Sequence, residues 1–372
     1  MHILRWIALA FFLASCASNV VPGETWESYA SAGKAGFSDD GLETLREAAD
    51  AGNTHSMMII RKGKVVFSYG DVAQTEGTYL ASVRKSILTM LMGEHVESGL
   101  INLDATLAEL GVDDIQGLTD EEKTATLRDL ISARSGIYHP ASNFSGVTDE
   151  GPKRGDHPPG IYYWYNNWDF NAAGGIFEDL VGKDIYEAFE EQFAGPLQLE
   201  DYDRAFHQEN GRTGDLTQSN YSAYHFYLSA RDVARLGLLM LYDGHWAGEQ
   251  VMPAGWAAES TEIRTPNGEM NPEKYRDSGF AYGYMWWVFD PAHFPRAFHG
   301  GYAARGHFGQ YIVVLPALDM VIVHKTAPIP YETQEEYAAV NVTWDEFRVL
   351  IDLALEAMPE KTDPLFIPVV AY

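Results

Sequence analysis

The chain has 372 residues, which is enough for one large domain or two modest ones. Its 53 acidic residues outnumber its 26 basic residues, and the net charge is −27. Such an acidic surface repels a phosphate backbone, so nucleic acid is not an expected partner. Cys16 is the only cysteine, which excludes an intramolecular disulfide.

The first 15 residues have the pattern of a secretory signal peptide. A basic start at residues 1–5 precedes an apolar run at residues 6–13, which is too short to span a bilayer as a permanent helix. The ending Leu13-Ala14-Ser15-Cys16 resembles the lipobox of bacterial lipoproteins, in which the cysteine is acylated after cleavage. The resemblance implies an exported protein of the bacterial cell envelope, lipid-anchored to the membrane through Cys16 on the periplasmic side. The residue after the cysteine is Ala17 and not the aspartate associated with retention in the inner membrane, which favours the outer membrane. The alternative is an ordinary secreted protein that is cleaved nearby.

A polar stretch rich in Gly, Ala and Ser predicts a flexible tether over residues 16–37, followed by one domain at residues 38–358 and a C-terminal tail at residues 359–372. Helical periodicity predicts a helix that starts near Ser82 and others at residues 39–51, 126–133, 171–181, 185–193, 230–242 and 345–358. Strands are predicted at residues 57–60 and 65–69, joined as a hairpin, and at residues 282–289, 296–299, 310–315 and 320–324. This order predicts an α/β (α+β) fold, in which an antiparallel sheet formed from both ends of the chain is flanked by helices and an all-helical lobe is inserted.

A serine lies three residues before a lysine where the helix near Ser82 begins. Positions i and i+3 share one helix face, so the Ser82 hydroxyl and the Lys85 ammonium are expected to point into the same space. A serine hydroxyl needs a neighbouring base to become a nucleophile, and a lysine with a lowered pKa can be that base. The alternative is an N-cap serine beside a solvated lysine. Ser31 and Lys34 repeat the spacing, but no apolar run follows them, so a flexible segment is expected there.

Two further groups of residues are candidates to join Ser82. Tyr165 and Asn167 form the only Tyr-x-Asn of the chain, within an aromatic stretch at residues 162–168. A tyrosine phenol held near a lysine can lose and shuttle a proton, although aromatic runs also serve only as core. The segment His299-Gly300-Gly301-Tyr302 lies beside a predicted strand, where paired glycines admit a substrate and the next N–H can face an oxyanion. Taken alone, a histidine there is more often structural than catalytic.

The order Ser82-x-x-Lys85, Tyr165-x-Asn167, His299-x-Gly301 resembles that of the serine β-lactamase-like and penicillin-binding protein superfamily. Within it, the chain is most similar to the class C-type branch of esterases, D,D-peptidases and nylon-oligomer hydrolases. Residues 127–136 and 228–235, and the pair Gly309-Gln310, resemble further segments of that family. The resemblance covers residues 38–358 and implies a β-lactamase/transpeptidase-like fold.

The resemblance also implies a role for each motif. Ser82 would attack a carbonyl and form an acyl-enzyme, while Lys85 and Tyr165 would move the proton. Asn167 would position the substrate or Lys85, and His299 would help to hold the substrate and Tyr165. Gly300 and Gly301 would let the substrate approach, and the N–H groups of Ser82 and Tyr302 would form the oxyanion hole. No metal and no cofactor are expected, because the chain has no His-Glu-x-x-His and no close Cys/His cluster.

One departure from the family pattern bears on the substrate. Typical β-lactamases have Lys-Thr-Gly at the third motif, and a histidine there is largely neutral at pH 7 and would bind an anionic β-lactam weakly. We therefore expect an esterase or amidase for a small ester, amide or short peptide with a neutral or apolar acyl part, next to walls such as Tyr163, Trp164 and Trp168. The alternatives are a β-lactamase or D,D-peptidase that acts on cell-wall peptides, and a catalytically inactive lipoprotein that binds the cell wall.

Overall fold

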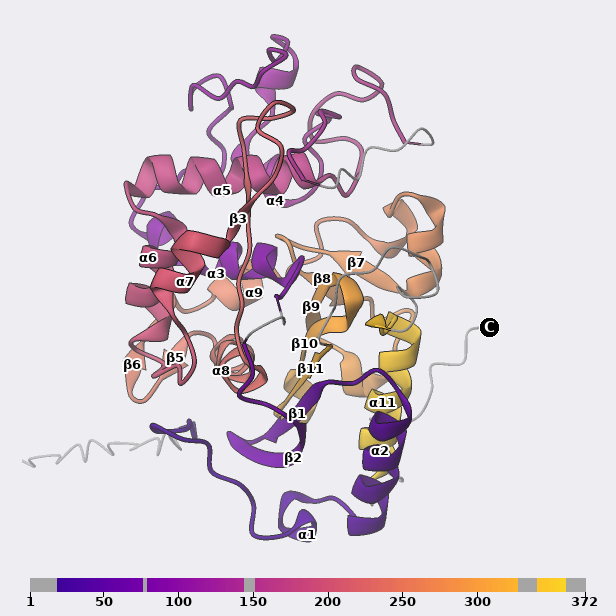
Figure 1. Cartoon of the computed structure of the whole chain (residues 1–372). Coiled ribbons are helices and arrows are strands. Elements are labelled where there is room, and N and C mark those ends of the chain that lie inside the picture. Colours follow the sequence, from indigo (N-terminus) through magenta and orange to yellow (C-terminus); the bar gives the residue numbers. More distant parts are fainter. Residues whose placement is uncertain (1–18, 76–78, 144–150, 327–339, 359–372) are drawn as a thin grey trace, which may run out of the picture.

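The computed structural model describes residues 19–75, 79–143, 151–326 and 340–358. Its framework is a seven-stranded sheet in the order β2-β1-β11-β10-β9-β8-β7, and every neighbouring pair is antiparallel. The strands are β1 (Ser56–Arg61), β2 (Lys64–Gly70), β7 (Phe280–Tyr282), β8 (Trp287–Phe289), β9 (Tyr302–Gly306), β10 (Gln310–Leu315) and β11 (Met320–Lys325). Since β1 pairs with β11, segments from both ends of the chain build one sheet, as the sequence predicts (Figure 1).

Helices cover both faces of this sheet. On one face, α2 (Asp39–Ala51) and α11 (Trp344–Glu356) lie side by side (Figure 1), and the ring of Tyr311 in β10 stacks on Phe347 of α11 at 4.7 Å. On the other face, Gly237 of α8 (Ala230–Leu241) lies against β10 and β11, where an added Cβ would be 2.6 Å from Val321. Successive strand residues point to opposite faces, so Ile312, the next residue of β10, contacts α8. Glycine lets the helix pack this closely.

The helical lobe is inserted between β2 and β7 (Figure 1). Its central helix α3 (Val83–Glu97) is buried from Val83 to Gly93, as expected for a helix surrounded by protein on all sides. The other helices of the lobe are α4 (Leu127–Ile131), α5 (Asn167–Val181), α6 (Ile185–Phe189), α7 (Arg204–Asn210) and α9 (Trp256–Ser260). The lobe is not entirely helical, because it also contains the short pairs β3 (Arg212–Thr213) with β4 (Ala223–Tyr224) and β5 (His245–Trp246) with β6 (Glu249–Gln250).

The strands before β10 differ from the prediction. The predicted strand at residues 282–289 is two strands, β7 and β8, which pair with each other across a turn in which Met285 has a φ of 59°. The predicted strand at residues 296–299 is a 3-10 helix, Arg296–Phe298, and β9 begins after it. The aromatic and apolar run through both strands, broken only by Gly283, hid the turn, because such a run has the pattern of one buried strand.

The predicted flexible tether is also wrong for the described residues 19–36. The indole of Trp26 donates a hydrogen bond to the carbonyl of Arg231 at 3.1 Å, and Arg235 donates to the carbonyl of Gly23 at 2.9 Å. Ser28 forms a parallel bridge with Val65 of β2, and a one-turn helix, α1 (Ala32–Ala35), follows. The domain therefore begins well before residue 38, because apolar side chains in this segment pack on the core.

The predicted signal peptide, Cys16 and the C-terminal tail lie outside the described residues. Among the helices within the described ranges, none is long and apolar enough to cross a membrane.

Candidate active site

Ser82 occupies the turn that leads into α3. The preceding residue, Ala81, has a φ of 47°, in the left-handed region that is costly for a residue with a side chain. Ser82 takes the N-cap position, but its side chain makes no capping hydrogen bond. Instead, its hydroxyl oxygen lies 2.9 Å from the Nζ of Lys85. The Ser82 side chain therefore does not cap the helix, and Lys85 is buried, so the alternative of a capping serine beside a solvated lysine is wrong.

Lys85 lies at the centre of the polar cluster and is only 1% exposed. Its Nζ contacts the Oγ of Ser82 at 2.9 Å, the phenol oxygen of Tyr165 at 2.5 Å and the Oδ1 of Asn167 at 2.6 Å. All three partners are neutral oxygens, so none of them is an anion that would favour the charged form of Lys85. The structure thus brings together four residues that the sequence selected from two separate motifs.

Burial shifts the pKa values of the two proton carriers in opposite directions. Burial, and then the neighbouring charge of Arg84, lowers the pKa of Lys85 well below the ordinary lysine value. Burial raises the pKa of Tyr165. Both directions favour a neutral amine at Lys85 beside a protonated phenol at Tyr165. An amine in this state can accept a proton from Ser82.

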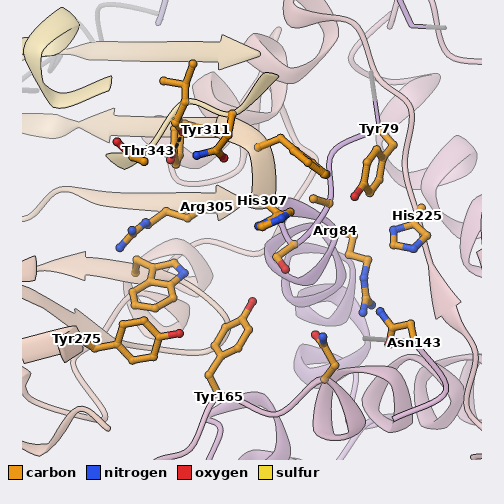
Figure 2. A pocket seen from close by; sticks show the side chains of 18 of the residues that line it. Tyr79, Arg84, Asn143, Tyr165, His225, Tyr275, Arg305, His307, Tyr311 and Thr343 are labelled. Carbon is orange, nitrogen blue, oxygen red and sulfur yellow. Dashed lines mark hydrogen bonds between the residues drawn. The ribbon is translucent and has the colours of Figure 1, made fainter. Parts of the chain in front are cut away.

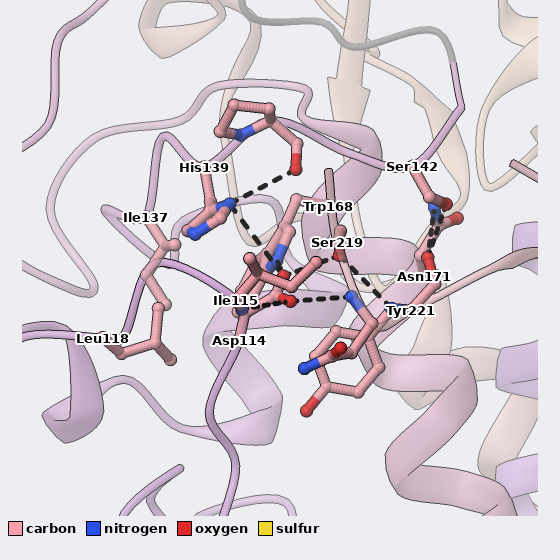
Figure 3. A network of polar contacts seen from close by, with 12 residues as sticks. Asp114, Ile115, Leu118, Ile137, His139, Ser142, Trp168, Asn171, Ser219 and Tyr221 are labelled. Atoms are coloured by element: carbon pink, nitrogen blue, oxygen red, sulfur yellow. Dashed lines mark hydrogen bonds and ion pairs between the residues drawn. The ribbon is translucent and has the colours of Figure 1, made fainter. Parts of the chain in front are cut away.

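A buried carboxylate holds the start of α5, the helix that carries Asn167 (Figure 3). The Oδ2 of Asp114 accepts hydrogen bonds from the indole of Trp168 and the hydroxyl of Ser219, both at 2.6 Å, and its Oδ1 accepts from the N–H of Asn220 at 2.7 Å. Burial alone raises the pKa of Asp114, but these hydrogen bonds more than offset burial and lower it overall. The sequence analysis missed Asp114, because no motif marks one acidic residue among 53.

The cluster opens into a cavity of about 910 Å³ between the helical lobe and the sheet edge at the end of β9 (Figure 2). This volume is within the range of sites for small organic ligands. Among the described residues that line the cavity there is no Asp or Glu, although the whole chain is strongly acidic. The lining includes Tyr79, Ser82, Arg84, Trp164, Tyr165, Asn167, His225, Lys274, Tyr275, Trp287, Arg305, Gly306, His307 and Phe308.

The structure does not bring His299, Gly300, Gly301 and Tyr302 to this cavity. They lie before and at the start of β9, whereas the other end of the strand, at Gly306, reaches the cavity. Tyr302 and Gly306 are four residue steps apart, which is roughly 13 Å along a strand. The ring of His299 contacts the carbonyl of Phe294 at 3.0 Å, and Tyr302 packs edge-on against Trp286. The third motif was therefore predicted at the wrong end of β9, because β9 itself was not predicted.

The segment that does reach the cavity is Arg305-Gly306-His307. A Cβ on Gly306 would lie 2.4 Å from the carbonyl oxygen of Leu80, so glycine is required for the strand to approach the turn before Ser82 this closely. Of the predicted aromatic walls, Trp164 lines the cavity, whereas Tyr163 and Trp168 are buried elsewhere in the core. The second Ser-x-x-Lys pair, Ser31 and Lys34, is on α1 and is not part of the cavity.

No group of three His, Cys, Asp or Glu side chains in the described ranges is arranged to hold a metal ion. The polar cluster consists instead of a hydroxyl, an amine, a phenol and an amide.

The family model described as Beta-lactamase matches residues 44–327, which is most of the chain. The chain therefore belongs to the Beta-lactamase family, and the resemblance inferred from the motifs is confirmed. The antiparallel sheet flanked by helices is the fold expected for this family.

Solved structures with this fold include several kinds of hydrolase. A protein described as a 6-aminohexanoate-dimer hydrolase from Bacillus anthracis is 19% identical, with 85% of this chain and 83% of that chain covered and a TM-score of 0.61. A class C beta-lactamase is 15% identical, with 89% and 98% covered and a TM-score of 0.58. A family VIII carboxylesterase is 13% identical, with 87% and 99% covered and a TM-score of 0.57. Because all three identities are below 20%, these comparisons show only that the folds are similar.

Proposed function

We propose that the protein is a serine hydrolase that cleaves an ester or amide through an acyl-enzyme on Ser82. The observation that carries the proposal is the buried Nζ of Lys85, 2.9 Å from the Ser82 hydroxyl and without a carboxylate among its hydrogen-bond partners. Burial keeps this amine neutral more easily than an exposed lysine, so it can act as a base. Family membership and the hydrolases among the similar folds support the same class of reaction.

In the first half of the reaction, the proton of the Ser82 hydroxyl moves to the neutral Lys85 amine as the Oγ attacks the substrate carbonyl carbon. The carbonyl oxygen becomes an oxyanion, which the backbone N–H groups of Ser82 and of the Gly306–His307 segment would stabilise. Each donor of this kind is typically worth about 3 kcal/mol. The C–O or C–N bond then breaks, and the leaving alcohol or amine takes a proton from Lys85 by way of Tyr165.

In the second half, a water molecule attacks the acyl-enzyme ester. Lys85 and Tyr165 accept the proton of that water, and the Ser82 oxygen is protonated again as the acid leaves. Asn167 holds the amine of Lys85 toward both reactants, since its Oδ1 is 2.6 Å from Nζ. Lys85 and Tyr165 thus transfer the proton in both halves of the reaction.

The proposal is tested with a fluorophosphonate probe, which labels activated serines, and with p-nitrophenyl butyrate as the substrate. We expect the wild-type protein to be labelled at Ser82 and to hydrolyse the ester, and the Ser82→Ala variant to lose both properties. Ser31→Ala is the matched control, because Ser31 also precedes a lysine by three residues but lies outside the cavity. It should behave like the wild type.

Wild-type protein that is neither labelled nor active on the ester would overturn the enzyme proposal and favour a lipoprotein that only binds. Nitrocefin and a D-Ala-D-Ala peptide, measured beside the ester, distinguish a β-lactamase or D,D-peptidase from an esterase. An amide analogue of the ester separates esterase from amidase.

A further inference from the structure

A second tyrosine lines the cavity close to Tyr165. Tyr275 lies in the 3-10 helix Glu273–Ser278, and its carbonyl accepts a hydrogen bond from the hydroxyl of Ser278 at 2.6 Å. Its ring packs edge-on against Trp287 with the ring centroids 5.7 Å apart, and Trp287 in turn packs on Tyr165 at 5.8 Å. The backbone and the ring of Tyr275 are therefore both held in place.

The hydroxyl of Tyr275 has no hydrogen-bond partner among the described residues, and Figure 2 shows it directed toward Tyr165. Burial is the main cause that raises the pKa of Tyr165, and the phenol of Tyr275 raises it further, so the two phenols lie close together. The phenol oxygen of Tyr165 and the Oδ1 of Asn167 already contact the Nζ of Lys85, at 2.5 Å and 2.6 Å. Tyr275 therefore offers an unoccupied oxygen next to the group that delivers the proton.

An amide substrate needs a hydrogen-bond acceptor at this place, whereas an ester does not. Before the C–N bond breaks, the nitrogen must turn its lone pair toward the proton that Tyr165 delivers, and its remaining N–H then points in another direction. Inside a cavity that N–H has lost its hydrogen bond to water, so an unpaired N–H raises the barrier. The described lining residues include no carboxylate, so the acceptor would be a neutral oxygen.

We propose that Tyr275 is a catalytic residue for secondary amides, whose phenol oxygen accepts a hydrogen bond from the N–H of the leaving amine, so that the protein hydrolyses amides and not esters alone. The proposal rests on the proposed hydrolase function and selects its amide form. As the C–N bond breaks, its electron pair moves to the nitrogen, which takes the proton that came from Ser82 by way of Lys85 and Tyr165. Tyr275 keeps its own proton, because burial holds its pKa above the ordinary tyrosine value.

The test compares p-nitrophenyl butyrate with butyryl-p-nitroanilide, which has an N–H in place of the ester oxygen. Both substrates give the same acyl-enzyme, so a difference between them arises before the acyl-enzyme has formed. We expect the wild type to hydrolyse both, and Tyr275→Phe to lower kcat/KM for the anilide about tenfold, mainly through kcat, since the lost hydrogen bond is made in the transition state. The ester should keep its kcat/KM, because p-nitrophenolate leaves without taking a proton.

Tyr163→Phe is the matched control. The hydroxyl of Tyr163 is also without a hydrogen-bond partner, but the residue is buried in the core and does not line the cavity. This variant should keep both activities. An unchanged rate with the anilide in Tyr275→Phe, or an equal loss with anilide and ester, would overturn the proposal. A wild type that hydrolyses the ester but not the anilide would also overturn it, while the proposed hydrolase function would stand.

The rate at which the fluorophosphonate probe labels Ser82 gives a readout that involves no leaving amine. The probe loses fluoride, so we expect Tyr275→Phe to be labelled at the wild-type rate, which would also show that the variant is folded. Markedly slower labelling of Tyr275→Phe would mean that Tyr275 supports the nucleophile instead of the leaving amine, and would overturn the proposal. Absence of both labelling and turnover in the wild type would overturn the proposed hydrolase function itself.

Discussion

At the scale of single residues, the proposed chemistry of the site depends on how a buried lysine is kept neutral. The partners of Lys85 among the described residues include no acid that would favour its charged form, and Arg84 beside it adds a repelling charge. Arg84 itself is held by Asn171 at 2.6 Å and by the ring of Tyr224 at 4.3 Å. Arg84 and Lys85 are adjacent on one helix, and the positive charge of Arg84 lowers the pKa of Lys85.

This arrangement predicts a shift in the pH profile of Arg84→Met. Lys85 must be neutral to accept a proton, so kcat/KM rises with pH through the pKa of Lys85, which burial and Arg84 hold below the ordinary lysine value. Without the Arg84 charge that pKa rises, and the acidic limb of the profile should move to higher pH. Arg84→Lys keeps a positive charge and should leave the limb in place. Identical limbs in wild type and Arg84→Met would show that Arg84 does not influence the base.

Local spacing was enough to predict four residues of the cluster. Helical periodicity relates Ser82 to Lys85 directly, and Tyr165 and Asn167 form a pair that occurs once in the chain. Arg305 and Asp114 could not be found in this way. The partners of Arg305 come from β7, β8 and α11, and those of Asp114 from α5 and residues 219–220, so only the folded chain brings them together.

At the scale of elements, the site depends on which end of β9 meets α3. The strand runs from Tyr302 to Gly306, and its last residue, Gly306, lies against the turn before Ser82. His299, Gly300 and Gly301 lie before the opposite end of this strand, which places them too far from Ser82 to contact a substrate bound there. The sequence identified β10 and β11 by their apolar runs, but the small residues of β9, such as Ala303 and Ala304, gave no comparable signal.

Gly306→Ala should therefore damage catalysis more than folding. The added Cβ would meet the carbonyl of Leu80 at 2.4 Å and push β9 away from Ser82. We expect kcat to fall about 100-fold, as small displacements of reacting groups can cause, and the free energy of unfolding to fall by about 1–3 kcal/mol. Steady-state kinetics and urea denaturation measure the two effects.

Gly300→Ala is the control at the opposite end of the strand. Its φ of 72° makes alanine unfavourable by about 1 kcal/mol, but no atom lies within 4 Å of the added Cβ. This variant should lose some stability and keep its kcat. A large loss of kcat in Gly300→Ala with none in Gly306→Ala would return the third motif to His299-Gly300-Gly301.

At the scale of the whole molecule, distant segments close the structure. The sheet joins β1 to β11, and the segment before α1 packs on the domain through Trp26, Arg235 and the carbonyl of Gly23. The architecture could be predicted from the order of strands and helices. Strands near both ends of the chain, with helices between them, are enough to indicate one sheet built from both ends. The docking of residues 19–36 was not predictable from a polar composition, since a few apolar contacts and hydrogen bonds such as those from the side chains of Trp26 and Arg235 to backbone carbonyls hold the segment in place.

We propose that Cys16 is acylated and anchors the protein to a membrane, on the strength of the sequence Leu13-Ala14-Ser15-Cys16. The wild type should then appear in the membrane fraction with a lipid-sized addition to its mass, and Cys16→Ser should appear in the soluble fraction without it. Trp26→Ala is the control for the docked segment. It should remain in the membrane fraction but have a lower Tm, because it loses the contacts with Arg231 and Arg235. A soluble wild type would contradict the anchor.

The docked N-terminal segment also sets how far an anchored domain can travel. The carbonyl of Val20 already lies against Gly63 in the turn between β1 and β2. Only four peptide steps separate Cys16 from Val20, and a fully extended chain covers about 14 Å in that length. A free tether up to residue 38 would have allowed roughly 75 Å. A lipid on Cys16 would therefore hold the domain almost in contact with the bilayer, with the β1–β2 turn nearest to it, and restrict the enzyme to substrates that come to the membrane surface.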